Sequence, residues 1–88
     1  MDRRALIEER LRAAFAPLAL TVEDESAKHR GHAGAVGGAG HFRVQLISER
    51  FRGRSRVERH RLVYDALAAE LGPEIHALAL ELRSPGER

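Results

Sequence analysis

The spacing of the apolar residues constrains this chain more than any other feature, because it switches twice from three or four positions to two. From residue 2 to residue 16 the apolar residues recur at the wider spacing, at Ile7, Leu11, Ala14 and Phe15. This pattern predicts an amphipathic helix that Pro17 ends. In the next segment the spacing drops to two, and Leu18, Leu20 and Val22 are expected to face the core. A helix followed by a half-buried strand is therefore predicted.

The same order returns after a long polar segment. HFRVQLIS predicts a strand in which Phe42, Val44 and Leu46 face the core. Ser55 and Glu58 then form a capping-box motif, in which the hydroxyl and the carboxylate each satisfy a free backbone amide at the start of a helix. We expect this helix to run to about residue 71, before the break at Gly72-Pro73. Its predicted buried stripe consists of Val57, His60, Tyr64, Leu67 and Leu71.

The segment IHALALELR alternates again and predicts a third strand. Its inner face is expected to carry His76, Leu78, Leu80 and Leu82. Because only a loop separates the first two strands, they should pair antiparallel, whereas a helical crossover makes the second and third parallel if they are adjacent. The sequence predicts an α+β fold in αββαβ order: a two-layer sandwich with both helices on one face of a mixed three-stranded sheet.

The segment between the first two strands, at about residues 26–40, is rich in glycine and lacks an apolar period, which predicts a flexible loop. It contains His29 and His32, and His41 follows at the outward-facing start of the next strand. Imidazole titrates near neutral pH and ligates metals well, so a proton switch, a metal site and a hydrophilic tether all fit this pattern. Of the three histidines, His41 is the least expected to act.

Two further histidines lie on predicted regular elements. His76 fits either a partly buried histidine hydrogen-bonded to the backbone or a metal ligand at the rim of the sheet, and its spacing alone favours the first. His60 lies on the predicted apolar stripe of the second helix, which favours a role in or behind the core. Neither histidine is part of a catalytic constellation, because no nucleophile with a base, no phosphate loop and no paired carboxylates can be identified. We expect no enzyme activity.

Composition limits the remaining classes of function. With 88 residues, 43% of them apolar and 32% charged, the chain predicts one globular domain over residues 1–88, with a short polar tail at about residues 84–88. It has no cysteine, so it can build neither a disulfide nor a thiolate site, and we expect a cytoplasmic protein. The net charge of +2 is small, but six arginines cluster within twelve residues: Arg50, Arg52, Arg54, Arg56, Arg59 and Arg61. They favour either a phosphate-binding surface or a solvated face balanced by nearby glutamates.

Four stretches of the chain closely resemble the BolA family. They are DESAKHRGHAG, GHFRVQLISERFRG, VERHRLVYDALAAEL and IHALALELRSP, and together they cover most of the chain. The resemblance implies a fold similar to the class II KH domain. It also implies a partner, a monothiol glutaredoxin, with which BolA-like proteins share a bridging 2Fe-2S cluster. The glutaredoxin and glutathione supply thiolates to this cluster, which is not expected in the isolated protein.

The resemblance also implies the ligands on this chain. The histidine of the IHAL motif, here His76, is the fixed ligand, and the loop supplies the second from His29 or alternatively from His32. The protein is then expected to be a monomer alone and a heterodimer with glutaredoxin, acting in iron-sulfur cluster trafficking or in iron and stress regulation. Some bacterial members of the family are transcriptional regulators, which implies DNA contact over residues 50–61. FRGRSR stands where a KH domain has its GXXG clamp, which argues against sequence-specific binding.

Overall fold

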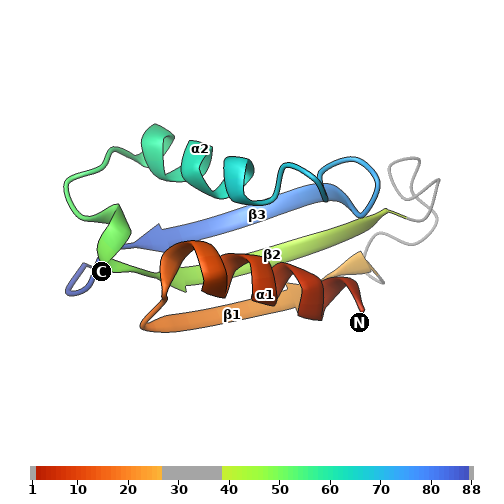
Figure 1. The fold of residues 1–88 in the computed structure, drawn as a ribbon, viewed down its shortest axis with the longest axis horizontal. Helices are drawn as coiled ribbons and strands as arrows, with labels where there is room; N and C mark the ends of the chain where they lie inside the picture. The colour runs from red at the N-terminus through yellow and green to blue at the C-terminus, as the bar shows by residue number, and fades with distance from the viewer. Residues whose placement is uncertain (1, 27–38, 88) are drawn as a thin grey trace.

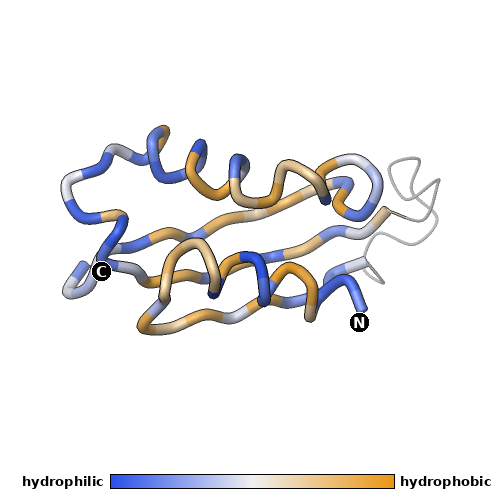
Figure 2. The backbone as a smooth tube through the Cα atoms, viewed as in Figure 1, coloured by the Kyte–Doolittle hydropathy of each residue, from blue (hydrophilic) through white to orange (hydrophobic). Residues whose placement is uncertain are grey.

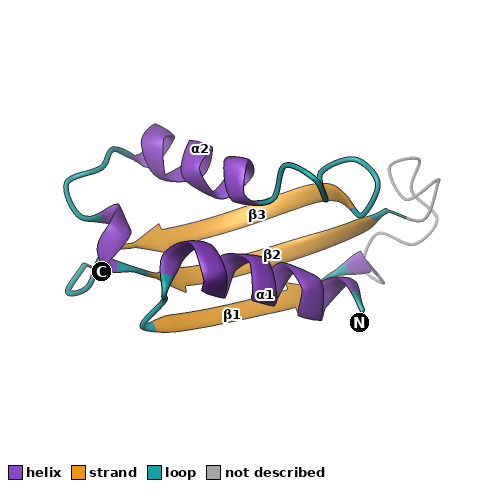
Figure 3. Ribbon diagram, in the orientation of Figure 1, coloured by secondary structure: helices purple, strands orange, loops and turns teal. Residues whose placement is uncertain are grey.

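The computed structural model describes residues 2–26 and 39–87, which form one helical layer and one sheet layer. The elements are α1 Arg3–Phe15, β1 Ala19–Asp24, β2 Gly40–Ile47, the short 3-10 helix η3 Glu49–Phe51, α2 Arg56–Ala66 and β3 Ile75–Arg83. Both helices lie on the same face of the sheet (Figure 1). The predicted α+β sandwich is therefore confirmed, with η3 as an element that the sequence pattern did not resolve (Figure 3).

The sheet has the strand order β1-β2-β3, with β2 in the centre. β1 pairs antiparallel with β2, so that Val22 lies opposite Val44. β2 pairs parallel with β3, and Phe42 lies opposite Leu78. The mixed sheet predicted from the connections is confirmed, because the α2 crossover returns the chain in the direction of β2.

The core lies between the helices and the sheet. Its buried apolar side chains are Ile7, Leu11, Phe15, Val22, Phe42, Val44, Leu46, Phe51, Val63, Leu67 and Ile75. Apolar positions recur along all three strands and on both helices (Figure 2). Phe51, from η3, packs against Phe15 with ring centroids 5.1 Å apart and so closes the core beyond the end of α1.

The ends of α1 and the start of α2 follow from local chemistry. The Asp2 carboxylate accepts a hydrogen bond from the Ala5 N–H, which caps the N-terminus of α1. At the other end Ala16 adopts a left-handed conformation, with φ of 44°, directly before Pro17. Ser55 and Glu58 make both hydrogen bonds of the predicted capping box. The sequence thus predicted the helix ends that depend on residues only a few positions away.

The predicted buried stripe of α2 is confirmed at Leu67 and partly at Leu71, but it is wrong at Val57 and Tyr64. Val63 and Leu67 are fully buried, whereas the side chains of Val57 and Tyr64 are 58% and 39% exposed. The regular helix also ends at Ala66, and turns replace the expected continuation to residue 71. The buried side of α2 includes the stem of Arg59, whose side chain is only 12% exposed, so a charged residue occupies a position that an apolar pattern cannot reveal.

Leu18 is also placed differently from the prediction. Its backbone N–H donates to the Ile47 carbonyl at 2.9 Å, so the chain already follows the sheet there. Leu18 is nevertheless 68% exposed, and the regular strand begins only at Ala19. Among residues 2–26 and 39–87, no helix is long and apolar enough to cross a membrane.

Candidate functional site

The start of β3 contains a β-bulge that determines where His76 lies. Gly40 pairs with Ile75 and His41 pairs with Ala77, so the register advances by two residues on β3 and by one on β2. His76 is the additional residue and is exposed, while Ile75 is buried. The prediction that His76 shares the inner face with Leu78 is therefore wrong. The bulge interrupts the alternation of side chains along β3 at His76 itself.

The imidazole of His76 lies beside that of His41. The two ring centroids are 5.1 Å apart and the ring planes are inclined by 49°. His41 precedes the core residue Phe42 in β2 and so lies on the opposite face of the sheet, which confirms its predicted outward direction. Its surroundings nevertheless leave it only 9% exposed. The structure thus brings together two histidines that the sequence analysis treated separately.

Backbone contacts hold His41 in place. Its N–H donates to the Ser26 hydroxyl at 3.1 Å, and its carbonyl accepts from the Glu25 N–H at 2.7 Å. The Glu25 carboxylate in turn forms an ion pair with Arg43, at 3.2 Å. A Cβ atom on Gly40 would lie 2.6 Å from the Phe42 ring and 2.9 Å from the Ser26 hydroxyl, so only glycine fits the close approach before His41.

His76 follows a turn that is tied to α1. The Glu70 carbonyl accepts hydrogen bonds from the N–H groups of Glu74 and Ile75, at 2.9 and 3.0 Å. Two ion pairs link this turn to the first helix: Arg3 with Glu74 at 2.6 Å and Arg10 with Glu70 at 3.4 Å. The backbone before His76 is therefore restrained by its own hydrogen bonds and by the neighbouring helix.

The other predicted ligands, His29 and His32, lie outside the described residues. Ser26 and Gly40, which are described on either side of that segment, both lie at the end of the sheet that carries His41 and His76. Within residues 2–26 and 39–87, no three or more metal-ligating side chains gather closely enough to hold an ion. A metal held at His76 therefore needs at least some of its ligands from outside these residues.

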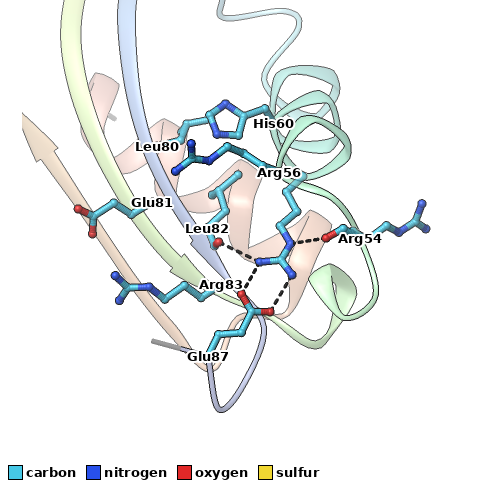
Figure 4. Close-up of a pocket in the computed structure, with 9 residues that line it drawn as sticks. Arg54, Arg56, His60, Leu80, Glu81, Leu82, Arg83 and Glu87 are labelled. Carbon is cyan, nitrogen blue, oxygen red and sulfur yellow. Dashed lines mark hydrogen bonds and ion pairs between the residues drawn. The ribbon is translucent and has the colours of Figure 1, made fainter.

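A groove at the other end of β3 collects part of the arginine cluster. It has a volume of about 430 Å³ and lies between the start of α2 and the end of β3 (Figure 4). Its lining residues are Arg54, Arg56, Arg59, His60, Leu80, Glu81, Leu82, Arg83 and Glu87. Because the capping box already uses amides at the start of α2, the side chains of Arg54, Arg56 and Arg83 are the groups here that suit an anion.

Arg59 has a structural role in this groove. Its guanidinium makes two 2.7 Å contacts with the Glu87 carboxylate and also donates to the carbonyls of Arg54 and Leu82. The hydrogen bonds from Arg59, followed by one from Ser84, lower the pKa of Glu87 to about 2. Arg59 thus links Glu87, in the predicted polar tail, to α2, and Ser84 of the same tail is buried.

The remaining arginines of the cluster separate into two groups. Arg52 forms a two-contact ion pair with Glu49, at 2.8 and 3.0 Å, and this contact lowers the pKa of Glu49. Arg50 and Arg61 are exposed but do not line the groove. His60, predicted to be in or behind the core, is partly exposed on the groove wall, with its ring edge-on to Tyr64 at 6.4 Å. The six arginines thus do not form one uniform surface.

Known proteins of one family are similar to this chain over most of its length. The family described as BolA-like protein matches residues 11–87. The Escherichia coli protein named DNA-binding transcriptional regulator BolA is 51% identical over 88% of this chain and 70% of its own length. Human BolA-like protein 1 is 46% identical over 94% of this chain and 58% of its own length.

The fold is similar to solved structures from the same group. The BolA domain of SufE1 from Arabidopsis thaliana superimposes with a TM-score of 0.87 at 39% identity, covering 100% of this chain and 98% of the other. In sequence, this chain matches SufE-like protein 1 of that plant with 43% identity and spans 24% of its length. The similarity to that relative is thus limited to one part of a longer protein.

Proposed function

Because the chain belongs to the BolA-like family, we propose that it is a non-enzymatic protein that binds a monothiol glutaredoxin and shares a bridging 2Fe-2S cluster with it. The role would be in iron-sulfur cluster trafficking or maturation, or in iron and stress regulation. The observation that carries the proposal is the exposed His76, held at a bulge at one end of the sheet.

The donor groups of this chain fit one side of such a cluster. The chain has no cysteine, so thiolates must come from glutaredoxin and glutathione, while imidazole is what this chain offers. Two histidines on one iron of a 2Fe-2S cluster are the ligand set of Rieske centres. His76 is the proposed fixed ligand, and His29 or His32 is the second ligand that the family resemblance implies. The cluster supplies visible absorption and one-electron redox chemistry when it is bound.

A partner-binding role also agrees with how the domain occurs in its relatives. In SufE-like protein 1 the region similar to this chain is a minor part of a longer protein, and the BolA domain of SufE1 has a nearly identical fold. The domain is therefore compatible with working beside another protein module. The Escherichia coli relative is named as a transcriptional regulator and the human relative as a BolA-like protein, which agrees with a non-enzymatic role.

The first experiment compares visible circular dichroism of a cluster-loaded monothiol glutaredoxin before and after this protein is added. Wild-type protein should change the spectrum, and His76→Ala should abolish that change because the fixed ligand is lost. His60→Ala, which removes a partly exposed histidine at the other end of the molecule, is the matched control and should behave as wild type. An unchanged spectrum with wild-type protein would refute the proposal.

DNA binding is the second candidate function, and two observations favour it. The Escherichia coli relative is named as a DNA-binding regulator, and the groove beside α2 presents Arg54, Arg56 and Arg83. Guanidinium groups suit phosphate recognition because they offer paired donors. If this surface binds DNA, the double change Arg54→Ala with Arg56→Ala should weaken the binding of duplex DNA whatever its base sequence.

The salt dependence tests whether Arg54 and Arg56 themselves contact phosphate groups. Each phosphate neutralised by an arginine that the variant removes should reduce the slope of log K against log salt by about 0.9. Arg12→Ala, an exposed arginine of α1, is the control and should leave the slope unchanged. Equal slopes for the double variant and wild type would exclude this groove as the binding surface.

A further inference from the structure

We infer that His41 and His76 together form a paired-imidazole site for a single transition metal ion on the outer side of the sheet. For the iron of a shared cluster, this inference rests on the proposed function and names His41 as the second ligand. For a free divalent ion it stands on the geometry of the pair alone. The family resemblance implies His29 or His32 for this role, and of the three histidines in that part of the sequence His41 was the least expected to act.

The spacing of the two rings fits one shared ion. A metal–nitrogen bond of about 2.1 Å and a ring radius of about 1.1 Å put each ring centre about 3.2 Å from the metal. At a tetrahedral angle of about 109°, two such ring centres lie about 5.2 Å apart. The rings of His41 and His76 are 5.1 Å apart. The observed separation of the two imidazoles therefore agrees with the separation expected around one tetrahedral ion.

The bulge is the feature that creates this pair. The core fixes Phe42 opposite Leu78 and therefore His41 opposite Ala77. With regular pairing continued toward the turn, His76 would lie opposite Gly40 and on the inner face. The extra residue instead brings His76 beside His41, which is the kind of redirection for which bulges are retained near functional sites.

The two backbones are also restrained before any ligand arrives. His41 is fixed on both sides by Ser26 and Glu25, and His76 follows a turn hydrogen-bonded to the Glu70 carbonyl. Ligands on restrained elements lose little freedom when they bind a metal. His41 is moreover in the central strand, where it pairs with Ala77 of β3.

The donor set indicates the class of ion. Imidazole nitrogens suit zinc, copper, nickel and iron, whereas magnesium and calcium prefer oxygen ligands. Because residues 2–26 and 39–87 hold no third ligand nearby, the remaining positions are left to water or to a partner. A pair with open positions is the arrangement that allows an ion to be shared between two proteins.

The first test uses the isolated full chain and Zn²⁺, observed through the imidazole nitrogens by ¹H–¹⁵N NMR. Both His41 and His76 should shift with one common saturation curve. His41→Gln and His76→Ala should each weaken Zn²⁺ binding at least tenfold, while His60→Ala should leave it unchanged. Shifts confined to His76 and the loop histidines, without His41, would overturn the inference and leave the two rings as a stacked pair only.

His41 is nearly buried, so its variant needs a check of folding. The thermal unfolding midpoint and the amide spectrum of His41→Gln report whether the sheet is intact. The nitrogen shifts of the wild-type protein decide the question even if this variant does not fold, because they observe the ligand directly.

The second test distinguishes this inference from the proposed function. With cluster-loaded glutaredoxin, loss of the new spectrum in both His76→Ala and His41→Gln supports the pair as cluster ligands. A second outcome is that the new spectrum is lost in His76→Ala and in one of the two variants His29→Ala and His32→Ala, while His41→Gln still gives it. This outcome supports the proposed function and refutes His41 as a cluster ligand. No new spectrum with wild type, combined with paired Zn²⁺ shifts, refutes the proposed function and supports the pair as a site for a free ion.

Discussion

Glu87 joins the last described turn of the chain to α2 through a single carboxylate. It accepts two hydrogen bonds from Arg59 and one from the Ser84 hydroxyl. Arg59 lies in turn over the Phe51 ring, with its guanidinium carbon 6.0 Å from the ring centroid. One exposed acid thus connects the turn after β3 to a residue that packs on the core.

Acidification should release this contact. Arg59 lowers the pKa of Glu87 from its ordinary 4.5 to about 2, so the folded state favours the charged carboxylate. Its stabilising contribution is complete above pH 4.5 and is lost as the pH falls through about 2. In a ¹³C NMR titration the Glu87 carboxyl should show a midpoint near 2.

The variant Arg59→Gln should raise that midpoint toward the ordinary value, because it removes the principal hydrogen-bond donor. Arg12→Gln, on the exposed side of α1, should not move it. A wild-type midpoint near the ordinary value of a glutamate would contradict the ion pair.

Gly40→Ala tests the close approach that precedes His41. The new methyl group would meet the Phe42 ring at 2.6 Å and the Ser26 hydroxyl at 2.9 Å, and the ring is part of the core. The free energy of unfolding in urea should fall by about 1–3 kcal/mol, as for other overpacked sites. Thr21→Ala, on an exposed position of β1, should change it by less than about 0.5 kcal/mol. Equal stability of Gly40→Ala and wild type would mean that the strand relaxes without cost.

At the scale of the element, α2 offers a matched pair of valines. Val63 is fully buried and Val57 is 58% exposed, although the chemical change to alanine is the same. Val63→Ala should lower the free energy of unfolding by about 2 kcal/mol, because it opens a cavity in the core. Val57→Ala should stay within about 0.5 kcal/mol of wild type. Urea unfolding of both variants checks this, and equal losses would mean that α2 is rotated as the sequence pattern predicted.

The sequence predicted where the helices and strands lie along the chain better than it predicted which side of each one is buried. The capping box could be identified because Ser55 and Glu58 are three residues apart and need no other part of the fold. The rotation of α2 could not, because the stem of Arg59 packs on its buried side and Val57 and Tyr64 remain outside. The position of His76 could not be predicted either, because a bulge depends on the register between two strands that are distant in sequence.

At the scale of the whole molecule, the two candidate surfaces lie at opposite ends of an elongated sandwich (Figure 1). His76 begins β3, and Arg83 ends it beside the basic groove. At about 3.3 Å per residue, roughly 23 Å separate these residues along the strand. The order of elements and the mixed sheet were predictable because connection lengths determine them, but this separation follows only from the observed register.

The separation predicts that the two surfaces act independently. Arg54→Ala with Arg56→Ala should leave the His76-dependent spectrum with glutaredoxin unchanged, and His76→Ala should leave DNA retention unchanged. Changes at sites this far apart and without shared contacts usually add. The combined variant, measured in both assays, should therefore equal the sum of the separate changes. A departure from additivity would indicate that one partner affects the binding of the other.

The central position of β2 has a consequence for local opening. From Phe42 to Ile47 its backbone is paired with a strand on each side, whereas within the described residues β1 and β3 each pair with β2 alone. Amide hydrogens of such a strand exchange with solvent mainly through global unfolding, because fraying at an edge does not expose them. His41 directly precedes the stretch of β2 that is paired on both sides, so we expect this ligand of the proposed ion site to stay in place when the edges of the sheet fray.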